Sequence, residues 1–327
     1  MNQLINIPVT IVTGFLGAGK TTLMNTILND WDKEKVAVLM NEFGHVSIDD
    51  KLLDETKFET IYTMKNGCIC CVTQNELEDV LADFMMRYLD GTLHFERLII
   101  ELSGFAHPLQ VIHTFFNDPL IKETYHLDCV VAVVDALHFQ KHLQFEENQV
   151  QLGCADLILI NKVDLVSKEE LEKIRTKLRS INAFAELKET SYSKLQLSSL
   201  FNRYTFDVHS NMELKYETSL HIHNTDIHSI VIEEESPLDI RKVNHFLNDE
   251  LHMLGDDLLR YKGILSIYGK NKRVVLQGLY HLFSSEVGKD WADGEKRISQ
   301  VVLIGKNLNQ KDLQRLFSKC VVDDYIV

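Results

Sequence analysis

The chain has 327 residues, of which 45% are hydrophobic and 25% charged, and its formal net charge at pH 7 is −14. This length favours two domains that each bury a core, and no window approaches the roughly 18–20 apolar residues of a membrane span. The acidic balance argues against a nucleic-acid partner, because proteins that bind a phosphate backbone carry clustered Lys and Arg. The N-terminus lacks the basic start of a signal peptide. We therefore expect a cytoplasmic protein with no membrane partner.

The first 205 residues alternate short apolar runs with helical patterns, which is typical of a parallel α/β sheet. The runs are nearly continuous in Val, Ile and Leu, so we expect strands that helices cover on both faces. These predicted strands lie at residues 7–13, 35–41, 97–102, 129–135 and 156–161. Between them, residues 75–89 carry apolar side chains at helical spacing.

The polar stretch 206–227 has no sustained periodicity and is predicted to be a linker between two domains. Beyond it, the pattern predicts a smaller α+β domain over residues 228–327. We expect its strands at residues 228–234, 263–269, 273–280 and 297–305, and its helices at about 237–253 and 309–320.

Residues 14–21, GFLGAGKT, fit the GxxxxGK[ST] pattern of a phosphate-binding loop, or P-loop. The loop follows a predicted strand and opens a helix, so backbone N–H groups and the helix dipole are available to phosphates. Lys20 is predicted to reach the β- and γ-phosphates, and the Thr21 hydroxyl to bind Mg²⁺. The predicted nucleotide-binding residues of this segment are Gly14, Gly17, Ala18, Gly19, Lys20, Thr21 and Thr22. The fold class is therefore a P-loop NTPase with a smaller C-terminal α+β domain.

The sequence Asn161-Lys162-Val163-Asp164 follows a predicted strand and precedes a helix that Ser167 would cap. A carboxylate at Asp164 accepts hydrogen bonds from N1–H and the 2-amino group of guanine. Adenine offers neither donor and would leave that carboxylate unpaired. Together with the P-loop, this motif predicts that the nucleotide is GTP, with the Lys162 stem against the base.

Glu101 ends a predicted strand and begins the sequence Glu-Leu-Ser-Gly. P-loop enzymes place an acidic residue at this position to hold Mg²⁺, directly or through water. Gly104 would then sense the γ-phosphate. We predict Lys20, Thr21, Glu101 and Gly104 as the catalytic set.

Three of the six cysteines, Cys68, Cys70 and Cys71, lie within four residues in the sequence Cys-Ile-Cys-Cys, the CxCC motif. They precede a predicted helix start, where the helix dipole favours thiolate, the form that binds transition metals. Three sulfurs would fill three positions of a tetrahedral zinc site, although two thiolates with outside ligands fit equally well. A redox dithiol is the competing interpretation. We expect the isolated Cys129, Cys154 and Cys320 to be buried.

His45 is a candidate further metal ligand, because it follows the second predicted strand, where such folds carry a nucleotide-sensing loop. A single loop histidine is more often an ordinary solvated side chain. His221, His223 and His228 in and beside the linker are weaker candidates of the same kind.

Taken together, the motifs resemble the CobW/YjiA family of metal-handling GTPases over nearly the whole chain. The segments that carry the resemblance are GFLGAGKTT (14–22), NEFG (41–44), NGCICC (66–71), ELSG (101–104), NKVD (161–164), LLRYKGIL (258–265), VVLQGLYHLF (274–283) and VVLIGKNL (301–308).

The resemblance implies a slow GTPase of a dimer-forming branch, with zinc bound at Cys70 and its neighbours and passed to a client protein. Family members serve several metals, so Co²⁺ and iron are alternatives to Zn²⁺. Close relatives can carry Glu at the positions of Met40 and His45. If those carboxylates bind metal in the relatives, the site in this chain is built differently, with Met40 or His45 as softer substitutes.

Our hypothesis from the sequence is that GTP and Mg²⁺ order residues 41–44 and 101–104, and so alter the metal geometry of the cysteines between them. Two other classes remain open. One is a kinase that transfers phosphate to a small acceptor, and the other is a zinc buffer or sensor in which the nucleotide is regulatory.

Overall fold

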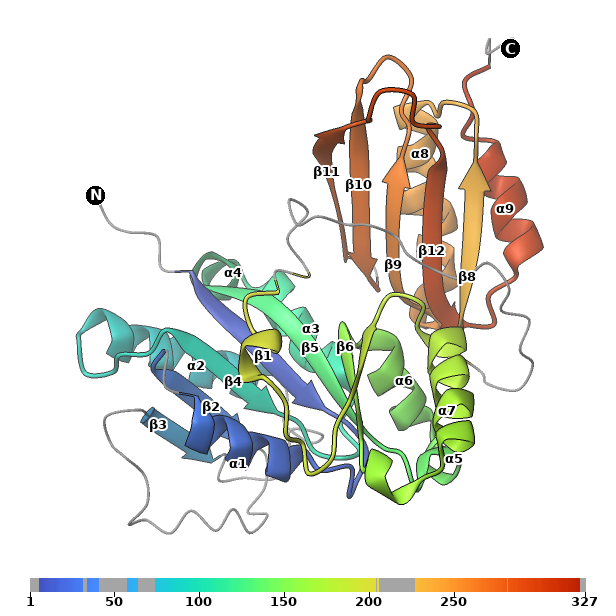
Figure 1. The fold of residues 1–327 in the computed structure, drawn as a ribbon. Coiled ribbons are helices and arrows are strands. Elements are labelled where there is room, and N and C mark those ends of the chain that lie inside the picture. Colours follow the sequence, from blue (N-terminus) through green and yellow to red (C-terminus); the bar gives the residue numbers. More distant parts are fainter. Residues whose placement is uncertain are drawn as a thin grey trace. The chain divides into compact units, whose positions relative to one another are not determined.

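A computed structural model of the chain describes residues 6–31, 34–40, 58–63, 74–203, 205, 227–280 and 282–323 (Figure 1). The chain forms two compact units. The first comprises Met1–Thr176 and Ala185–Phe206, and the second Lys177–Phe184 and Asp207–Val327. Across the described residues, no helix has both the length and the apolar character needed to cross a bilayer.

The first unit is built on a parallel sheet, to which the described residues contribute seven strands in the order β3-β2-β4-β1-β5-β6-β7. The strands are β1 (Ile7–Thr13), β2 (Val36–Met40), β3 (Phe58–Thr63), β4 (Arg97–Glu101), β5 (Tyr125–Asp135), β6 (Leu157–Asn161) and β7 (Glu186–Glu189). The order reverses direction at β1, between β4 and β5. Ligands of such sheets bind at the carboxyl ends of the strands at this switch point.

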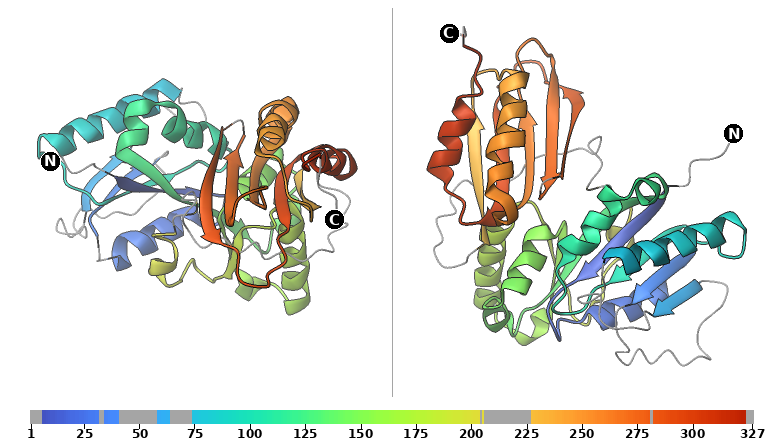
Figure 2. Two further views of the ribbon diagram at one scale, coloured as in Figure 1. Left: turned by 90° about the horizontal axis from the view of Figure 1, so that it is seen from above. Right: turned by 180° about the vertical axis from the view of Figure 1, so that it is seen from behind.

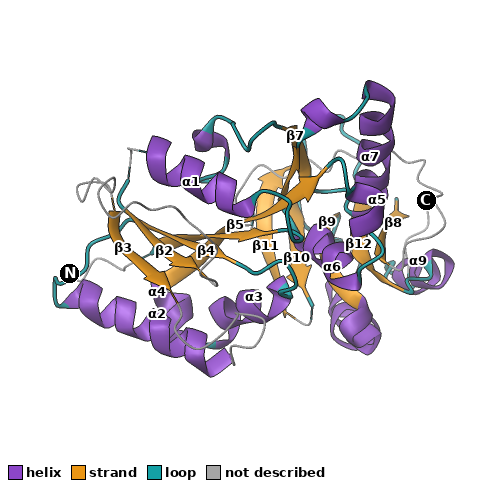
Figure 3. Cartoon of the chain, turned by 90° about the horizontal axis from the view of Figure 1, so that it is seen from below, coloured by secondary structure: helices purple, strands orange, loops and turns teal. Residues whose placement is uncertain are grey.

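Helices cover both faces of this sheet, with α1 on one face and α2, α3 and α4 on the other (Figure 3). The helices of the first unit are α1 (Lys20–Asp30), α2 (Gln74–Leu89), α3 (Pro108–Asn117), α4 (Pro119–Thr124), α5 (Phe139–His142), α6 (Glu146–Cys154) and α7 (Lys168–Ile181), with short 3₁₀ turns η1 (Val163–Leu165) and η2 (Leu197–Ser199). Leu23 and Ile27 of α1 are fully buried in one core with Val38, Val131 and Phe201. The predicted class, a P-loop fold with a two-sided parallel sheet, is confirmed.

Three strands differ from the sequence prediction. β3 and β7 were not predicted, and β7, of sequence Glu-Leu-Lys-Glu, is a partly exposed edge strand with no apolar run. β5 begins at Tyr125, four residues before the predicted start, because His126 and Asp128 interrupt the apolar pattern. Asp128 is nevertheless buried, since Arg97 donates a hydrogen bond to it.

The second unit is an antiparallel sheet with helices on one face (Figure 2). Its strand order is β11-β10-β9-β12-β8. The elements are β8 (Ile227–Glu234), α8 (Ile240–His245), η3 (Phe246–Glu250), η4 (His252–Asp257), β9 (Leu258–Leu265), β10 (Lys272–Leu279), β11 (Leu282–Asp290), β12 (Ser299–Lys306) and α9 (Gln310–Ser318). Phe246 and Phe317 lie in its core, with ring centroids 5.5 Å apart.

Two predictions in the second unit were wrong in position. The strand expected at 263–269 is β9, which begins five residues earlier, because the buried Arg260 interrupts the apolar run there. The helix expected at about 237–253 is short: α8 gives way to a π-helical turn and then to the 3₁₀ helix η4. β11 was not predicted, and its residues 283–286 are exposed at the sheet edge.

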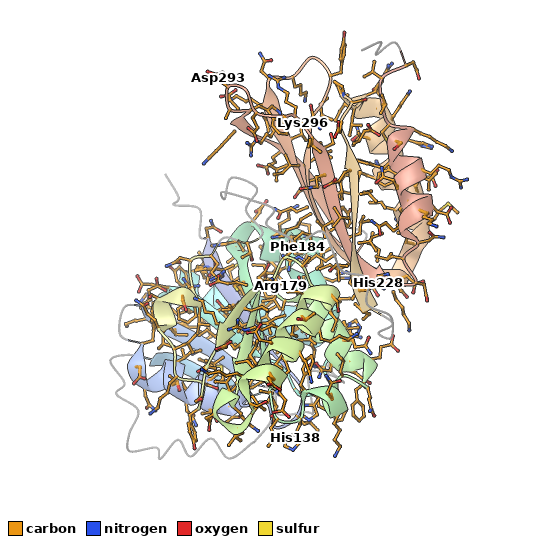
Figure 4. All side chains as sticks on the ribbon, turned by 45° about the vertical axis from the view of Figure 1, so that its right-hand side comes forward. His138, Arg179, Phe184, His228, Asp293 and Lys296 are labelled. Atoms are coloured by element: carbon orange, nitrogen blue, oxygen red, sulfur yellow. The ribbon has the colours of Figure 1, made fainter. Side chains whose placement is uncertain are left out.

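The end of α7 packs within the second unit. Ser229 Oγ of β8 donates to the Ile181 carbonyl at 2.9 Å and accepts from the Ala183 N–H at 3.1 Å. The Lys262 ammonium lies 5.9 Å from the Phe184 ring centroid, and Figure 4 labels Phe184 and Arg179 in this segment. The three isolated cysteines, Cys129, Cys154 and Cys320, are buried, as predicted.

Candidate functional site

The P-loop joins β1 to α1 and packs tightly against the sheet. Gly14, Gly17 and Gly19 have φ values of 136°, 73° and 108°, a region that favours glycine. A Cβ atom at Gly14 would lie 2.3 Å from the Val133 carbonyl oxygen of β5. At Gly14 the loop therefore lies closer to β5 than a residue with a side chain could. Such glycines let a P-loop turn its backbone N–H groups toward phosphates.

Lys20, the first residue of α1, lies over this loop. Its ammonium donates to the Gly14 carbonyl at 2.8 Å and to the Phe15 carbonyl at 3.3 Å. The first turn of α1 carries no acidic residue, so its positive dipole end is left available to an anion. This arrangement fits the triphosphate of a nucleotide, with the lysine already at the loop.

The P-loop hydroxyl and the carboxylate that ends β4 meet at the same edge of the sheet. Val12 of β1 pairs in register with Glu101, and Thr21 Oγ1 lies 3.5 Å from Glu101 Oε1. Glu101 is only 8% exposed. A hydroxyl beside a buried carboxylate is the oxygen donor set that Mg²⁺ takes in P-loop proteins. The two predicted Mg²⁺ residues are thus neighbours.

Gly104, in the turn after β4, contacts the P-loop directly. A Cβ atom there would lie 2.5 Å from Leu16 Cδ2 and 2.7 Å from the Leu16 backbone nitrogen. The Gly104 carbonyl accepts a hydrogen bond from Gln151 at 3.0 Å. Beside it, Phe105 stacks edge-on against Phe15 of the P-loop, with ring centroids 5.0 Å apart.

Asn161, at the end of β6, connects the NKVD motif to the P-loop. Its side-chain nitrogen donates to the Ala18 carbonyl at 2.9 Å, and its oxygen accepts from the Ser193 N–H at 3.1 Å. Ser193 Oγ in turn donates to the Gly19 carbonyl at 3.2 Å. Asp164 lies exposed in η1. The predicted cap of α7 is present, because Ser167 and Glu170 bond to each other through side chain and backbone.

Sequence reasoning missed three residues of this region. Ser193 lies in a loop after β7 and has a φ of 54°, and no local pattern marks it. Phe15 was treated only as a variable position of the P-loop. Asp135 ends β5 and forms a 2.6 Å ion pair with Lys162. A carboxylate that ends an apolar run, as Glu101 does, is the signal that would have found Asp135.

The predicted metal ligands lie outside the described residues: His45, Cys68, Cys70, Cys71, and the linker residues His221 and His223. His228, the remaining histidine of that group, lies in β8 with Nε2 3.3 Å from the Leu308 carbonyl. Within the described ranges, His, Cys, Asp and Glu side chains form no group of three that would hold a metal ion.

The flanks of the metal motif are nevertheless placed. Met40, the last residue of β2, pairs in register with Thr63 of β3 and with Glu101 of β4. The described strands β2 and β3 therefore end side by side, at the same end of the sheet as Glu101.

A P-loop after β1, a carboxylate at the end of β4 and an NKxD motif at the end of β6 define a nucleotide-binding P-loop protein. The chain belongs to the CobW/HypB/UreG family: the model of that nucleotide-binding domain matches residues 8–188. The cobalamin synthesis protein cobW C-terminal domain matches residues 227–321. The family resemblance that the sequence suggested is confirmed.

Individual relatives match over nearly the whole chain. The zinc chaperone YjiA of Escherichia coli is 41% identical over 318 residues, covering 95% of this chain and 98% of the relative. The zinc chaperone CobW of Pseudomonas aeruginosa is 30% identical, covering 95% and 90%. The crystal structure of Zn(II)-bound YjiA GTPase from E. coli matches with a TM-score of 0.82 at 38% identity, over 98% of this chain and all of that one.

Proposed function

We propose that this chain is a GTP-hydrolysing metallochaperone that binds zinc at its CxCC motif and couples the state of the nucleotide to metal transfer to a client protein. The observation that carries the proposal is the register of Met40 with both Thr63 and Glu101. The described ends of β2 and β3, after which the sequence continues into the two metal-motif segments, therefore lie beside Glu101, which supports the proposed coupling. Its general class, a P-loop GTPase, agrees with the relatives that are named GTPases.

The nucleotide roles follow from the described contacts. Lys20 would exchange its loop carbonyls for the β- and γ-phosphates, while Thr21 and Glu101 would hold Mg²⁺. A bound Mg²⁺ supplies positive charge that offsets the charge developing on the phosphates. Gly104 would sense the γ-phosphate. Its turn packs directly against Leu16 of the P-loop, so a movement of the turn would displace Leu16. Asp164 would read guanine.

The metal is cargo in this proposal. Cys68, Cys70 and Cys71 would offer thiolates to Zn²⁺, and His45 a neutral imidazole. Thiolate and imidazole ligands also suit Co²⁺, which is therefore the second candidate metal. The relatives named zinc chaperones support zinc as the first.

The proposal gives each part of the chain a separate role. We propose that residues 1–205 carry the nucleotide and metal chemistry, that 206–227 connect the two domains, and that 228–327 recognise the client. We further propose a cytoplasmic location and a homodimer as the assembled form.

The test is a zinc titration of the wild type and of Cys70→Ser, each with a GTP analogue and with GDP. We expect the wild type to bind zinc with different affinities in the two nucleotide states. By linkage, zinc must then change nucleotide affinity by the same factor. Cys70→Ser should lose zinc affinity and keep nucleotide affinity. Equal zinc affinities in both states would remove the coupling, and unchanged zinc affinity in Cys70→Ser would remove the cysteine site.

Two rival functions are distinguished by the products of the reaction. Phosphoryl transfer to a small acceptor would indicate a kinase, whereas release of inorganic phosphate alone indicates a GTPase. A zinc buffer needs no hydrolysis, so loss of metal delivery in Lys20→Ala would exclude it.

A further inference from the structure

We propose that Asp135, the last residue of β5, is a positioning residue for the guanine nucleotide that acts through Lys162. The proposal rests on the guanine site proposed above and adds a residue to it. Asp135 belongs to none of the P-loop, Glu101 or NKVD segments. It lies between them, on the strand that separates β1 from β6.

The contact between the two side chains is short and largely shielded from water. Lys162 Nζ lies 2.6 Å from Asp135 Oδ2, and the side chains are 31% and 2% exposed, respectively. The pairing of Asp135 with Asn161 across β5 and β6 places the carboxylate one residue from the lysine backbone. A buried carboxylate holds a charged partner more firmly than a solvated one, because water screens the pair less.

The backbone of Lys162 shows why the lysine needs this anchor. Its φ of 62° and ψ of 34° lie in the left-handed region, which residues other than glycine rarely adopt. A lysine side chain without a bound partner would not hold the Lys162 backbone in this region. The ion pair to Asp135 fixes the far end of the side chain and so favours this conformation.

The Asp135 carboxylate is also held by His138, through both of its oxygens. His138 donates its backbone N–H to Asp135 Oδ1 at 3.2 Å, and its Nδ1 lies 2.9 Å from Oδ2. Figure 4 labels His138 at the margin of the first unit. Burial alone would raise the pKa of Asp135, but the bonds from Lys162 and His138 outweigh it and hold the pKa below its ordinary value. The carboxylate therefore stays ionised at neutral pH.

The consequence for binding is preorganisation. Because Asp135 holds the Lys162 ammonium at the end of β5, the lysine stem extends from the end of β6 toward β5. Its methylene groups would then be available to pack on the plane of the base. A side chain that is already ordered loses less conformational entropy when the nucleotide binds. GTP and GDP share the same base, so the gain in affinity must be equal for both.

The test is Asp135→Asn, which keeps the shape and removes the charge. We expect the Kd values for GDP and for a non-hydrolysable GTP analogue to rise together, on the order of tenfold, with their ratio unchanged. In steady-state hydrolysis the effect should fall on KM rather than on kcat. If the ratio of the two Kd values changes instead, Asp135 acts at the phosphates and the proposal is wrong.

A double-mutant cycle with Lys162→Met tests the route of the effect. If Asp135 acts through Lys162, Asp135→Asn should have little further effect on Kd in the Lys162→Met background. A tenfold loss in both backgrounds would overturn the proposal. Asp118→Asn is the matched control: Asp118 caps α4 through the Ile121 N–H, and asparagine caps equally well. Its Kd values should equal those of the wild type.

Two more variants keep the test decisive. Asp135→Glu keeps the charge but displaces it by one methylene, so we expect a Kd between those of the wild type and Asp135→Asn. Should Asp135→Asn fail to fold, wild-type nucleotide affinity in Lys162→Met would count against the proposal. Asp164→Asn tests the guanine site itself. The asparagine amide can donate a hydrogen bond to the 2-oxo group of xanthine, so this variant should prefer XTP to GTP. If Asp164→Asn shifts preference and Asp135→Asn has no effect, only the positioning role fails. If Asp164→Asn shows no shift, the guanine site fails.

Discussion

The side chain of Asn161 and the backbone of Ser193 are joined by a 3.1 Å hydrogen bond across 32 residues of chain. The same asparagine donates to Ala18 of the P-loop. One amide group therefore connects the phosphate loop, the NKVD motif and the loop after β7. A Cβ atom at Gly19 would lie 2.3 Å from the Asn161 side-chain nitrogen, so the fit leaves no spare room.

Replacing Asn161 with alanine should loosen all three segments. The two lost hydrogen bonds are each worth about 1 kcal/mol, so we expect unfolding free energy to fall by roughly 2 kcal/mol and the Kd values for GTP and GDP to rise. Denaturant unfolding and nucleotide titration measure the two effects. Asn248→Ala, at an exposed helical asparagine that bonds to Asn244, is the control. A variant with wild-type nucleotide affinity would show that this connection serves stability alone.

Local motifs could be predicted from the sequence, while contacts between distant segments could not. The P-loop and Asn161 were predicted because each sits in a short pattern at the end of an apolar run. Ser193 was not, because its place beside Asn161 depends on how β7 and the following loop fold back. Asp135 ends an apolar run, but its contact with Lys162 could not be predicted, because Lys162 follows the neighbouring strand β6 and the contact depends on how the two strands pair. The edge strand β11 was missed because its residues 283–286 are exposed and leave no apolar pattern.

Gly104→Ala should impair the turn that follows Glu101. Its new methyl group would meet the Leu16 side chain and backbone, both under 3 Å away, and would push the turn off the P-loop. We expect hydrolysis to fall at least tenfold, because a shift on the order of 1 Å near the reacting groups has effects of this size or larger. GDP affinity should change less. Adding Leu16→Ala removes the side-chain part of the clash, and hydrolysis should then recover in part. No recovery would place the defect at the Leu16 backbone.

Arg97→Met should strongly destabilise the first unit. The Arg97 side chain is fully buried and bonds to Glu34, Asp128 and Asn202 at 2.9, 2.9 and 2.6 Å. Removing one partner of a buried ion pair leaves the other charge in a dry site, at a cost of about 3–5 kcal/mol. Denaturant unfolding measures the loss.

The matched control for Arg97→Met is Arg241→Met. Arg241 also pairs with an aspartate, Asp239, but its side chain is 88% exposed. Water screens such a pair, so the midpoint of unfolding should hardly move. Similar losses in the two variants would show that burial does not decide the strength of the Arg97 contacts.

His142 should titrate at a lower pH than an ordinary histidine. Burial lowers its pKa, despite the opposing charge of Asp135, and its ring lies 4.8 Å from that of Phe15. Because the folded pKa is below the unfolded value, the stability contribution is complete above about pH 6.5 and is lost as the pH falls through the lowered pKa. NMR titration of the imidazole measures the pKa directly.

Two phenylalanine variants test the cause of this shift. Phe15→Leu uncovers the His142 ring and should raise its pKa toward the ordinary value. Phe115→Leu alters an aromatic contact with Tyr125 elsewhere in the unit and should leave the titration unchanged. A His142 pKa that is the same in Phe15→Leu as in the wild type would mean that other groups shield it.

Strand β4 keeps Arg97 and Glu101 roughly 13 Å apart, since it pairs on both sides with β1 and β2 and cannot stretch. Near its amino end, Asp128 binds Arg97 and also accepts from the N–H groups of Asn202 and Arg203. Residues 202–205 are therefore tied to the amino end of β4 through Asp128. Glu101 and Thr21 lie at the other end of the strand, so a substitution at Asp128 should disturb the anchoring of residues 202–205 and leave the Thr21–Glu101 contact in place.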